Sequence, residues 1–453
     1  MISVYIENIG PFENASIELK PLTILIGRNS VGKSLLLYLL WSLASAEPDF
    51  AEVKGGWEEV SKLAEKIVEE VQKGENPEEE VKQALLAFYG NVLKEAIRIG
   101  IEERIKYVFG VEPKELIKIG KEKALIRVQG DCARLEIVVS NRVELKDVEL
   151  CLDEALKELH INVLRKGAIE AKYKDLSKEF EIASTADISE IIIWFYAVRV
   201  TQVFEDFILG GLPTSILLPD SRAGVTRIAL KPYPVIGIPL GVDVEYRDTY
   251  FRLAEQLHKE PKILDLAKPL FNELGAVPEA RFEAGAYTIY VRTWTGKVLP
   301  FSMAPSGVRE ALTTVLALTT PSISKYIIAN VFVEEPEAHL HPRALRFLAR
   351  LIARAVNAYA RRVIVTTHSD YLISYLNNLI IASRLSGEKL SKLGLSREEA
   401  LKPNDVAVYL VKAVNGSAIV EPIQVTEHGI LEEEFSKIAE EILWERDRIY
   451  AEL

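Results

Sequence analysis

Short apolar runs alternate with stretches of helical periodicity along most of the chain. Near the start, residues 2–6 and 15–19 have the alternation of strands, and residues 23–26 form a continuous apolar run that is typical of a buried strand. A helical apolar stretch follows. Towards the other end the predicted elements alternate: helix 308–319, strand 327–333, helix 342–359, strand 362–366 and helix 371–381. This order favours an α/β core with a largely parallel sheet.

Between these parts the pattern changes. Val60, Leu63, Ile67 and Val71 step by three or four residues, as in an amphipathic helix whose other faces are charged. Further predicted elements are a hairpin or meander at 124–150, helices at 152–160, 188–209 and 245–275, and strands at 215–218, 286–292 and 297–301. The predicted organisation is 1–51, N-terminal part of the core; 52–212, a largely helical insertion with a β hairpin; 213–320, a second lobe; and 321–453, the rest of the core.

Composition and charge narrow the classes of protein. The chain has 453 residues, of which 49% are hydrophobic and 27% charged, so a sizeable core can form. Its net charge of −11 excludes a protein that coats nucleic acid by bulk charge. Two cysteines, Cys132 and Cys151, are too few for a disulfide framework or a four-thiolate zinc site. No apolar run approaches the roughly 20 residues of a membrane span. We therefore expect a cytoplasmic protein without a membrane partner.

The strongest chemical motif follows the apolar run 23–26. It reads Gly27-Arg28-Asn29-Ser30-Val31-Gly32-Lys33-Ser34, the Walker A pattern of a phosphate-binding loop. Glycines let backbone N–H groups surround an anion, and the next helix directs its N-terminus at the phosphates. We expect Lys33 to bridge the β- and γ-phosphates and the Ser34 hydroxyl to bind Mg²⁺.

Two later strands end in residues that suit the same chemistry. The strand before Glu334-Glu335 resembles a Walker B strand, with Glu334 on the metal side and Glu335 as general base. The strand before His368 lies one helix further on, so its end should face the same crevice. His368 is then placed to bond the γ-phosphate and orient water. The helix that starts near Ser306-Gly307 has two interpretations, an ordinary Ser306 N-cap or an anion site.

Together these motifs resemble those of ABC-type ATPases, and most closely the SMC/RecF/OLD-like branch. The resemblance rests on Walker A, on the Ser306-Gly307 helix start, on residues 334–342 and 366–369, and on the N-terminal stretch 6–12. It implies a P-loop fold of ABC type that binds ATP and Mg²⁺. It also implies an ATP-dependent homodimer in which Ser306 of one subunit completes the other subunit's site.

The chain departs from that pattern at three places. Glu334 stands where the family more often has Asp, and Val308 stands where transporters have a second glycine. Gln129 is the available candidate for the Q-loop glutamine. The segment after His368 lacks the acidic motifs of a Toprim nuclease, so we expect no nuclease activity of that type.

The resulting prediction is an ATPase, forming ADP and phosphate, whose slow turnover closes and opens a dimer in DNA repair, chromosome-associated or defence processes. One alternative is an ATP-gated platform for nucleic acid or protein with negligible turnover. Another is the ATPase subunit of a two-component system with a separate nuclease.

Three weaker signals have competing interpretations. Arg343, Arg346, Arg350 and Arg354 share a helix face, which is either solvated or a contact strip for DNA phosphates. His339, His341 and His368 suggest a transition-metal site as a minor alternative to a dimer contact. Arg222 belongs to an ordinary turn, or it reaches a nucleotide or partner.

Overall fold

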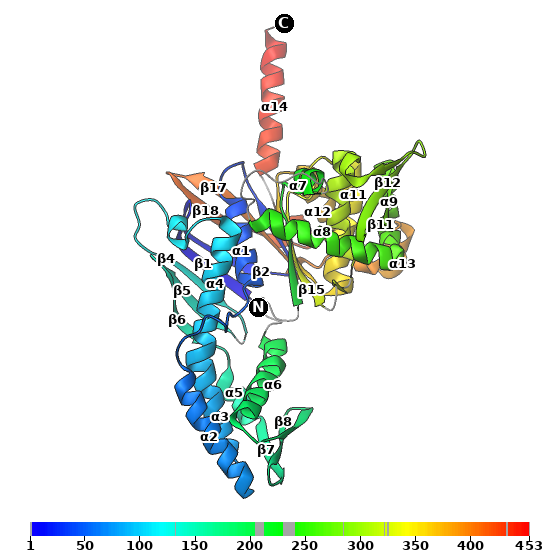
Figure 1. Ribbon diagram of the computed structural model, residues 1–453. Coiled ribbons are helices and arrows are strands. Elements are labelled where there is room, and N and C mark those ends of the chain that lie inside the picture. Colours follow the sequence, from blue (N-terminus) through cyan, green and yellow to red (C-terminus); the bar gives the residue numbers. More distant parts are fainter. Residues whose placement is uncertain are drawn as a thin grey trace. The chain divides into compact units, whose positions relative to one another are not determined.

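The computed structural model describes residues 2–131, 133–203, 213–229, 241–283, 285–320, 322–323, 326–431 and 434–452. The chain forms two compact units. The first comprises residues 1–10 and 42–212, and the second comprises residues 11–41 and 213–453. Each unit has its own strands and helices (Figure 1). Within the described residues, no helix is both long and apolar enough to cross a bilayer.

The second unit is built on a mainly parallel sheet. Its strand order is β10 (Pro213–Leu218), β15 (Tyr326–Glu334), β16 (Arg362–Thr367), β3 (Leu22–Ile26), β17 (Val406–Val414), β18 (Ser417–Ile423) and β2 (Phe12–Leu19). The pairs from β10 through β17 are parallel, whereas β17 and β18 form an antiparallel hairpin. The short β14 (Ser322–Ile323) pairs antiparallel with β15. The predicted α/β class with a largely parallel sheet is confirmed.

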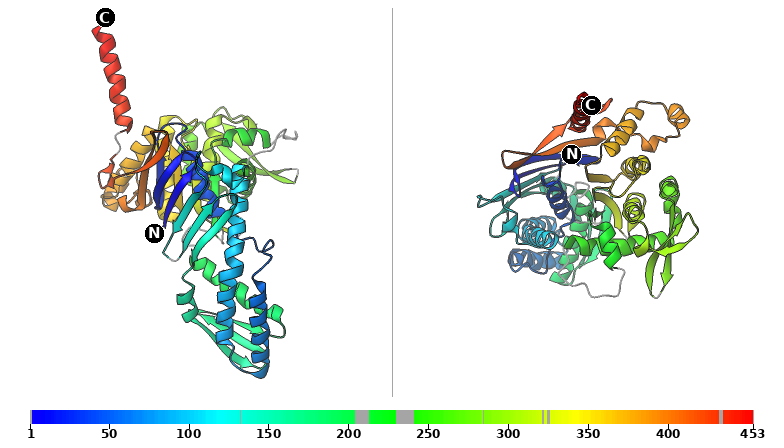
Figure 2. Two further views of the ribbon diagram at one scale, coloured as in Figure 1. Left: turned by 90° about the vertical axis from the view of Figure 1, so that its left-hand side faces the viewer. Right: turned by 90° about the horizontal axis from the view of Figure 1, so that it is seen from above.

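The second unit also contains helices. They are α1 (Lys33–Ser45), α7 (Arg222–Ala229), α8 (Gly241–Lys259), α9 (Lys268–Glu273), α10 (Ser306–Thr319), α11 (Pro342–Tyr359), α12 (Asp370–Ala382), α13 (Gly387–Lys392) and α14 (Glu434–Ala451). Leu22, Ile24 and Ile26 of the buried strand β3 belong to one large apolar cluster with residues of α8, α10, α11 and α12. Figure 2 shows the ribbon from two further sides. Since α10 is buried from Val308 onward, it is a core helix in which only Ser306 and Gly307, at its start, are half-buried.

Smaller elements complete this unit. Three antiparallel strands are β11 (Ala276–Glu283), β12 (Ala286–Thr293) and β13 (Val298–Pro300), and β19 (Val425–Thr426) pairs with β20 (Gly429–Ile430). The short helical turns are η4 (Pro261–Ala267), η5 (Phe301–Met303), η6 (Arg397–Glu399) and η7 (Pro403–Asp405).

The first unit combines an antiparallel sheet with a helical bundle. Its sheet has the order β1 (Ile2–Ile9), β4 (Ala124–Gln129), β5 (Arg134–Val139) and β6 (Val143–Glu149). Its helices are α2 (Trp57–Lys73), α3 (Glu78–Ala87), the π-helical η1 (Phe88–Leu93), α4 (Lys94–Phe109), η2 (Pro113–Leu116), α5 (Leu152–Lys157) and α6 (Thr185–Val203). Val60, Ile67 and Val71 are buried in α2, which confirms the amphipathic interpretation.

One part of this unit differs from the sequence prediction. The helix expected at 152–160 stops at Lys157, and Leu159 opens a three-stranded antiparallel sheet of β7 (Leu159–Arg165), β8 (Ala168–Tyr173) and β9 (Leu176–Glu181). A tight turn at Gly167, with φ of +79°, makes the first hairpin, and this turn outweighs the helical propensity before it. The predicted helix 188–209 is α6, and residues 204–212 lie outside the described residues. Cys151, just before α5, is disulfide-bonded.

Candidate functional site

Three strands of the second unit end side by side. In the parallel register, Glu334 of β15 lies opposite Thr366 of β16, and Thr367 lies opposite Ile26 of β3. Adjacent strands are about 4.8 Å apart. The loops that follow β3, β15 and β16 therefore leave from one edge of the sheet, where an open α/β sheet has its ligand crevice.

The loop after β3 has the backbone of the predicted phosphate loop. Gly27 and Gly32 have φ of +146° and +104°, and a Cβ at Gly27 would lie 2.0 Å from the carbonyl oxygen of Val411. Only glycine fits there. Ser30 also has a positive φ, of 63°. Helix α1 begins at Lys33, so its N-terminus opens from this loop, while Arg28, Asn29 and Ser30 are exposed.

Lys33 lies buried under the loop. Its Nζ donates to the carbonyl oxygens of Gly27 at 3.0 Å and Arg28 at 2.7 Å. Burial lowers the pKa of Lys33, and the carboxylates of residues 335, 334 and 337 act in the opposite direction. The ammonium group of Lys33 and these three carboxylates therefore interact electrostatically.

Glu334 is a buried carboxylate with two donors. Its Oε2 accepts from the Tyr38 hydroxyl at 2.6 Å and from the Asp220 backbone N–H at 3.2 Å. Burial, and then Glu334, raise the pKa of Tyr38, which keeps its phenol as a donor. Tyr38 follows the exposed Ser34 by one helical turn, so both lie on one face of α1.

Excess negative charge gathers beside Glu334. Burial raises the pKa of Asp220, and Glu334 and Glu335 raise it further. Such a cluster is stabilised by a hard cation. Within the described residues, however, no three His, Cys, Asp or Glu side chains form a ready metal site. Mg²⁺ is commonly held by one or two carboxylates together with phosphate oxygens and water.

Glu335 is held in a left-handed backbone conformation, with φ of +44°. Its N–H donates to the Thr366 carbonyl oxygen at 3.1 Å. Its Oε1 lies 3.3 Å from His368 Nε2. Burial lowers the pKa of His368, as does Lys33, while Glu335 opposes them. The lowered pKa favours the neutral imidazole at neutral pH.

Glu337 fixes the segment that follows. It is deeply buried, and its Oε1 accepts from the Thr367 hydroxyl at 2.6 Å and the His368 N–H at 2.8 Å. Burial raises the pKa of Glu337, whereas these two donors lower it. Glu337 thereby ties the chain after β15 to the chain after β16.

The start of α10 differs from one of its two interpretations. The helix begins at Ser306 itself after Pro305, and no side chain caps it, so Ser306 is not the N-cap. A Cβ at Gly307 would lie 2.7 Å from the carbonyl oxygen of His339. The Ser306-Gly307 turn thus packs closely against the segment after β15, and glycine is required by that approach.

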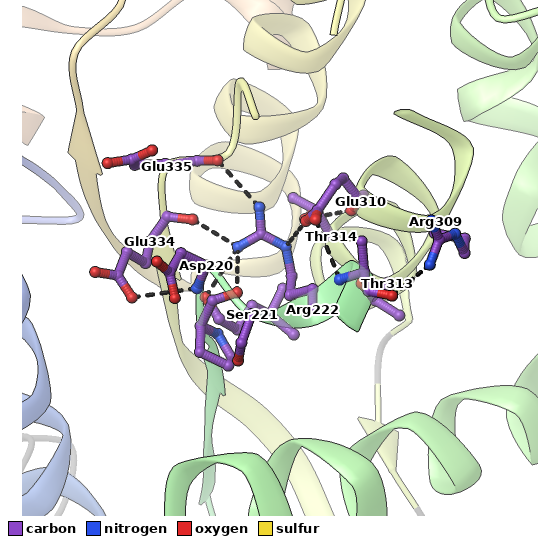
Figure 3. A network of polar contacts seen from close by, with 12 residues as sticks. Asp220, Ser221, Arg222, Arg309, Glu310, Thr313, Thr314, Glu334 and Glu335 are labelled. Carbon is purple, nitrogen blue, oxygen red and sulfur yellow. Dashed lines mark hydrogen bonds and ion pairs between the residues drawn. The ribbon is translucent and has the colours of Figure 1, made fainter. Parts of the chain in front are cut away.

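Arg222 joins these parts, and sequence reasoning missed its role. Its guanidinium is fully buried between the loop after β15 and helix α10 (Figure 3). It donates to the carbonyl oxygens of Glu334 and Glu335, and its Nε lies 2.7 Å from Glu310 Oε2. Neither interpretation of Arg222, as part of an ordinary turn or as a ligand contact, anticipated this internal bridge.

Other signals resolve differently. Arg350 and Arg354 form ion pairs with Glu399, at 2.8 and 3.1 Å, which leaves Arg343 and Arg346 of the arginine strip exposed. His341 caps α11 by accepting from the Arg343 N–H. The candidate Gln129 is an exposed residue at the end of β4, in the first unit.

Two family models match the chain. Residues 1–197 match a family described as "AAA ATPase domain", and residues 228–374 match one described as "AAA domain, putative AbiEii toxin, Type IV TA system". Walker A lies in the first match, and Ser306, Glu334, Glu335 and His368 lie in the second. Residues 1–197 and 228–374 are thus similar to AAA-type ATPase domains. No curated protein matches this ATPase.

Solved structures of SMC heads also align with this ATPase. One is an SMC head bound to the C-winged helix domain of ScpA, with 11% identity, a TM-score of 0.43, and coverage of 93% of this chain and 98% of that one. The SMC head domain from Thermotoga maritima has 11% identity, a TM-score of 0.36 and the same coverages. An Smc head with an extended coiled coil, bound to the C-terminal domain of ScpA derived from Pyrococcus furiosus, has 10% identity, a TM-score of 0.42, and coverage of 98% and 100%.

Proposed function

We propose that the chain binds ATP with Mg²⁺ and hydrolyses it slowly, and that this cycle closes and opens a head-to-head homodimer. The proposal is carried by one observation: β3, β15 and β16 bring Lys33, Glu334, Glu335 and His368 to the same edge of one sheet. Phosphoryl transfer to water needs a glycine-rich loop, a lysine at the phosphates and an acid that positions the water, and the residues at this edge supply all three.

Each residue has a role in this proposal. The loop from Gly27 to Ser34 cradles the phosphates, and Lys33 leaves its loop carbonyls to bridge the β- and γ-phosphates. Ser34 and Glu334 would hold Mg²⁺, and a bound Mg²⁺ would supply positive charge next to the phosphates. Glu335 takes the proton of the attacking water, and the neutral His368 orients that water. In a closed dimer, Ser306 and Gly307 of one subunit contact the γ-phosphate bound to the other.

The direct test is Glu335→Gln. Removing a general base lowers the rate of hydrolysis by roughly 10²- to 10⁴-fold without removing the phosphate site. ATP should therefore bind normally and hold the variant as a long-lived dimer, measured by light scattering. Glu388→Gln, the same change at an exposed glutamate of α13, is the matched control. A Glu335→Gln variant that hydrolyses ATP at the wild-type rate, or that stays monomeric at saturating ATP, contradicts the proposal.

The family description of residues 228–374 favours a defence process over chromosome organisation for this switch, because it names a toxin of a type IV toxin–antitoxin system. We expect regulated expression in a bacterial host to slow growth, and Lys33→Ala to relieve the effect. Growth that is slowed equally by both proteins would argue against a nucleotide-dependent toxin. We also propose a cytoplasmic location and contacts with DNA or with a separate nuclease. When DNA binding is measured, the exposed Arg343 and Arg346 are the residues to mutate.

A further inference from the structure

All three guanidinium nitrogens of Arg222 contact acceptors within the protein. Nη1 donates to the carbonyl oxygens of Leu218 at 3.1 Å, Pro219 at 2.8 Å and Glu334 at 2.5 Å, and Nη2 donates to that of Glu335 at 3.0 Å. Its Nε faces Glu310 Oε2 at 2.7 Å. Arg222 thus contacts the end of β10, the end of β15 and helix α10 at once (Figure 3).

On one side, Arg222 stabilises a strained backbone. A residue other than glycine in a left-handed conformation costs about 1–3 kcal/mol and persists only where its surroundings hold it. Glu335 is such a residue, with φ of +44°. Thr366 accepts from its N–H, and Arg222 donates to its carbonyl oxygen, so the residue is held from both ends. Without the guanidinium, one of these two restraints is lost.

On the other side, Arg222 reaches the first turns of α10. Glu310 is 1% exposed, and its second carboxylate oxygen accepts from the Ala223 N–H at 3.1 Å. The adjacent Arg309 is also buried and donates to the carbonyl oxygens of Ala223 and Ala304. The start of α10 is therefore fastened to the segment that carries Arg222, and Gly307 belongs to that same start.

Stability alone does not require the acid in this arrangement. Replacing a buried ion pair by apolar groups of the same volume is often neutral or stabilising. The same unit also buries Arg361, whose guanidinium donates to the carbonyl oxygens of Ala317 and Thr320. What Glu310 adds at Arg222 is a directional link between α10 and the backbone of Glu335.

We propose that Arg222 is a positioning residue for ATP hydrolysis, which holds the backbone of Glu335 in register and links it through Glu310 to the Ser306-Gly307 start of α10. The inference rests on the proposed function, in which Glu335 is the general base. A shift of the helix start, as on closure around a second subunit's nucleotide, is then passed to Glu335 within the same chain.

The test compares Arg222→Lys with Arg361→Lys. Lysine keeps the charge but lacks the planar fork that serves four carbonyls and an acid. A displaced general base lowers kcat by about 10- to 100-fold. We therefore expect this loss for Arg222→Lys, with the ATP Kd within about twofold of wild type. Arg361→Lys is the matched control, and we expect it to lower Tm while kcat of the folded protein stays within about twofold.

Glu310→Gln tests the link itself. Glutamine keeps an acceptor for the Ala223 N–H but removes the charge that faces Arg222. We expect kcat to fall by about 3- to 10-fold, and the double variant to be no slower than Arg222→Lys alone, because residues that act as a unit are not additive. Losses that multiply in the double variant overturn the link to α10.

Other outcomes separate the inference from the proposed function. If Arg222→Lys keeps wild-type kcat while Tm falls as in Arg361→Lys, Arg222 is only structural and the inference is wrong. If Arg222→Lys does not fold, as judged by circular dichroism, Glu310→Gln decides alone, and an unchanged kcat overturns the inference. Glu335→Gln is measured in parallel. Should it hydrolyse ATP normally, the proposed function fails; should it be inactive beside a normal Arg222→Lys, only the inference fails.

Discussion

The two ends of helix α10 are each held by a buried arginine, but the two arginines find different acceptors. At the C-terminal end, Arg361 donates to the carbonyl oxygens of Ala317 and Thr320. A helix always leaves such carbonyls unpaired at its C-terminus. At the N-terminal end the helix offers no free carbonyl, so Arg222 takes its acceptors from the loop after β15 and from the side chain of Glu310. The arginine at the N-terminal end of α10 therefore contacts Glu334 and Glu335, whereas the described side-chain contacts of the arginine at the C-terminal end are with the helix's own carbonyl oxygens and a tyrosine ring.

Charge follows the same division. Burial lowers the pKa of Arg361 to about 10, and the Tyr359 hydroxyl opposes this shift. Its described partners are carbonyls and the Tyr359 ring, 4.8 Å from the guanidinium carbon. Arg222 instead has the carboxylate of Glu310, and burial raises the pKa of that acid while Arg222 lowers it. The arginine at the N-terminal end of α10 therefore has a carboxylate partner, whereas the described partners of the arginine at the C-terminal end are carbonyl oxygens and an aromatic ring.

The largest effect should come from breaking the coupled end. Glu310→Ala leaves Arg222 buried without its counter-charge, and removing one partner of a buried ion pair costs about 3–5 kcal/mol. We expect the free energy of unfolding in urea to fall by that amount. Arg361→Met removes a guanidinium from the other end without leaving a charge behind, and we expect a smaller loss of about 1–3 kcal/mol. Equal losses at the two ends would remove the distinction between them.

A smaller effect should come from the packing of the same helix start. In Gly307→Ala the new methyl would meet the His339 carbonyl oxygen at 2.7 Å, and overpacking of this kind costs about 1–3 kcal/mol. We expect both Tm and kcat to fall, because the shift reaches Arg309 and Glu310. Gly224→Ala in α7 is the control, since a Cβ there meets no atom within 4 Å. A Gly307→Ala variant with unchanged Tm and kcat would show that the helix start is not tightly placed.

The fold and the glycine-rich loop after β3 could be predicted because their signals are local. The phosphate loop is eight consecutive residues, and the α/β order is visible in apolar runs that are each shorter than 20 residues. Tyr38 was missed although a signal existed, since it follows Ser34 by four positions on the same helix. The sheet β7–β8–β9 was missed because a helical pattern before Leu159 gave no warning of the turn at Gly167.

The buried bridge could not be predicted at all. Arg222 and Glu334 are 112 residues apart, and nothing in the turn Pro219-Asp220-Ser221-Arg222 indicates which distant carbonyls its arginine will contact. The partners of a buried charge depend on residues that are distant in the sequence. The glycines of a phosphate loop are required by the loop's own backbone conformation, so they can be recognised locally. Sequence patterns therefore predicted the groups that we propose to meet a nucleotide and missed Arg222, which contacts the backbone of two of them.

The smallest effect should come from pH, and it separates the two ends again. His368 faces Glu335 and Lys33, and burial, followed by Lys33, lowers its pKa below the usual 6.5. The folded state then binds fewer protons than the unfolded chain. The stability that His368 contributes is present above pH 6.5 and is lost as the pH falls through the lowered pKa. Arg361, with its pKa of about 10, stays charged throughout this range.

The rate of ATP hydrolysis should depend on the protonation of His368. Protonated His368 would donate to Glu335 and compete for its carboxylate, so we expect kcat to be flat from pH 8 to 6.5 and to fall as the pH drops through the lowered pKa of His368. The check is a pH–rate profile of the wild type beside His368→Gln and Arg361→Lys. The decline through the lowered pKa of His368 should vanish in His368→Gln and persist in Arg361→Lys, since only the first change removes a titrating group beside Glu335. A decline that persists unchanged in His368→Gln would assign it to another group and remove His368 from the water-orienting role.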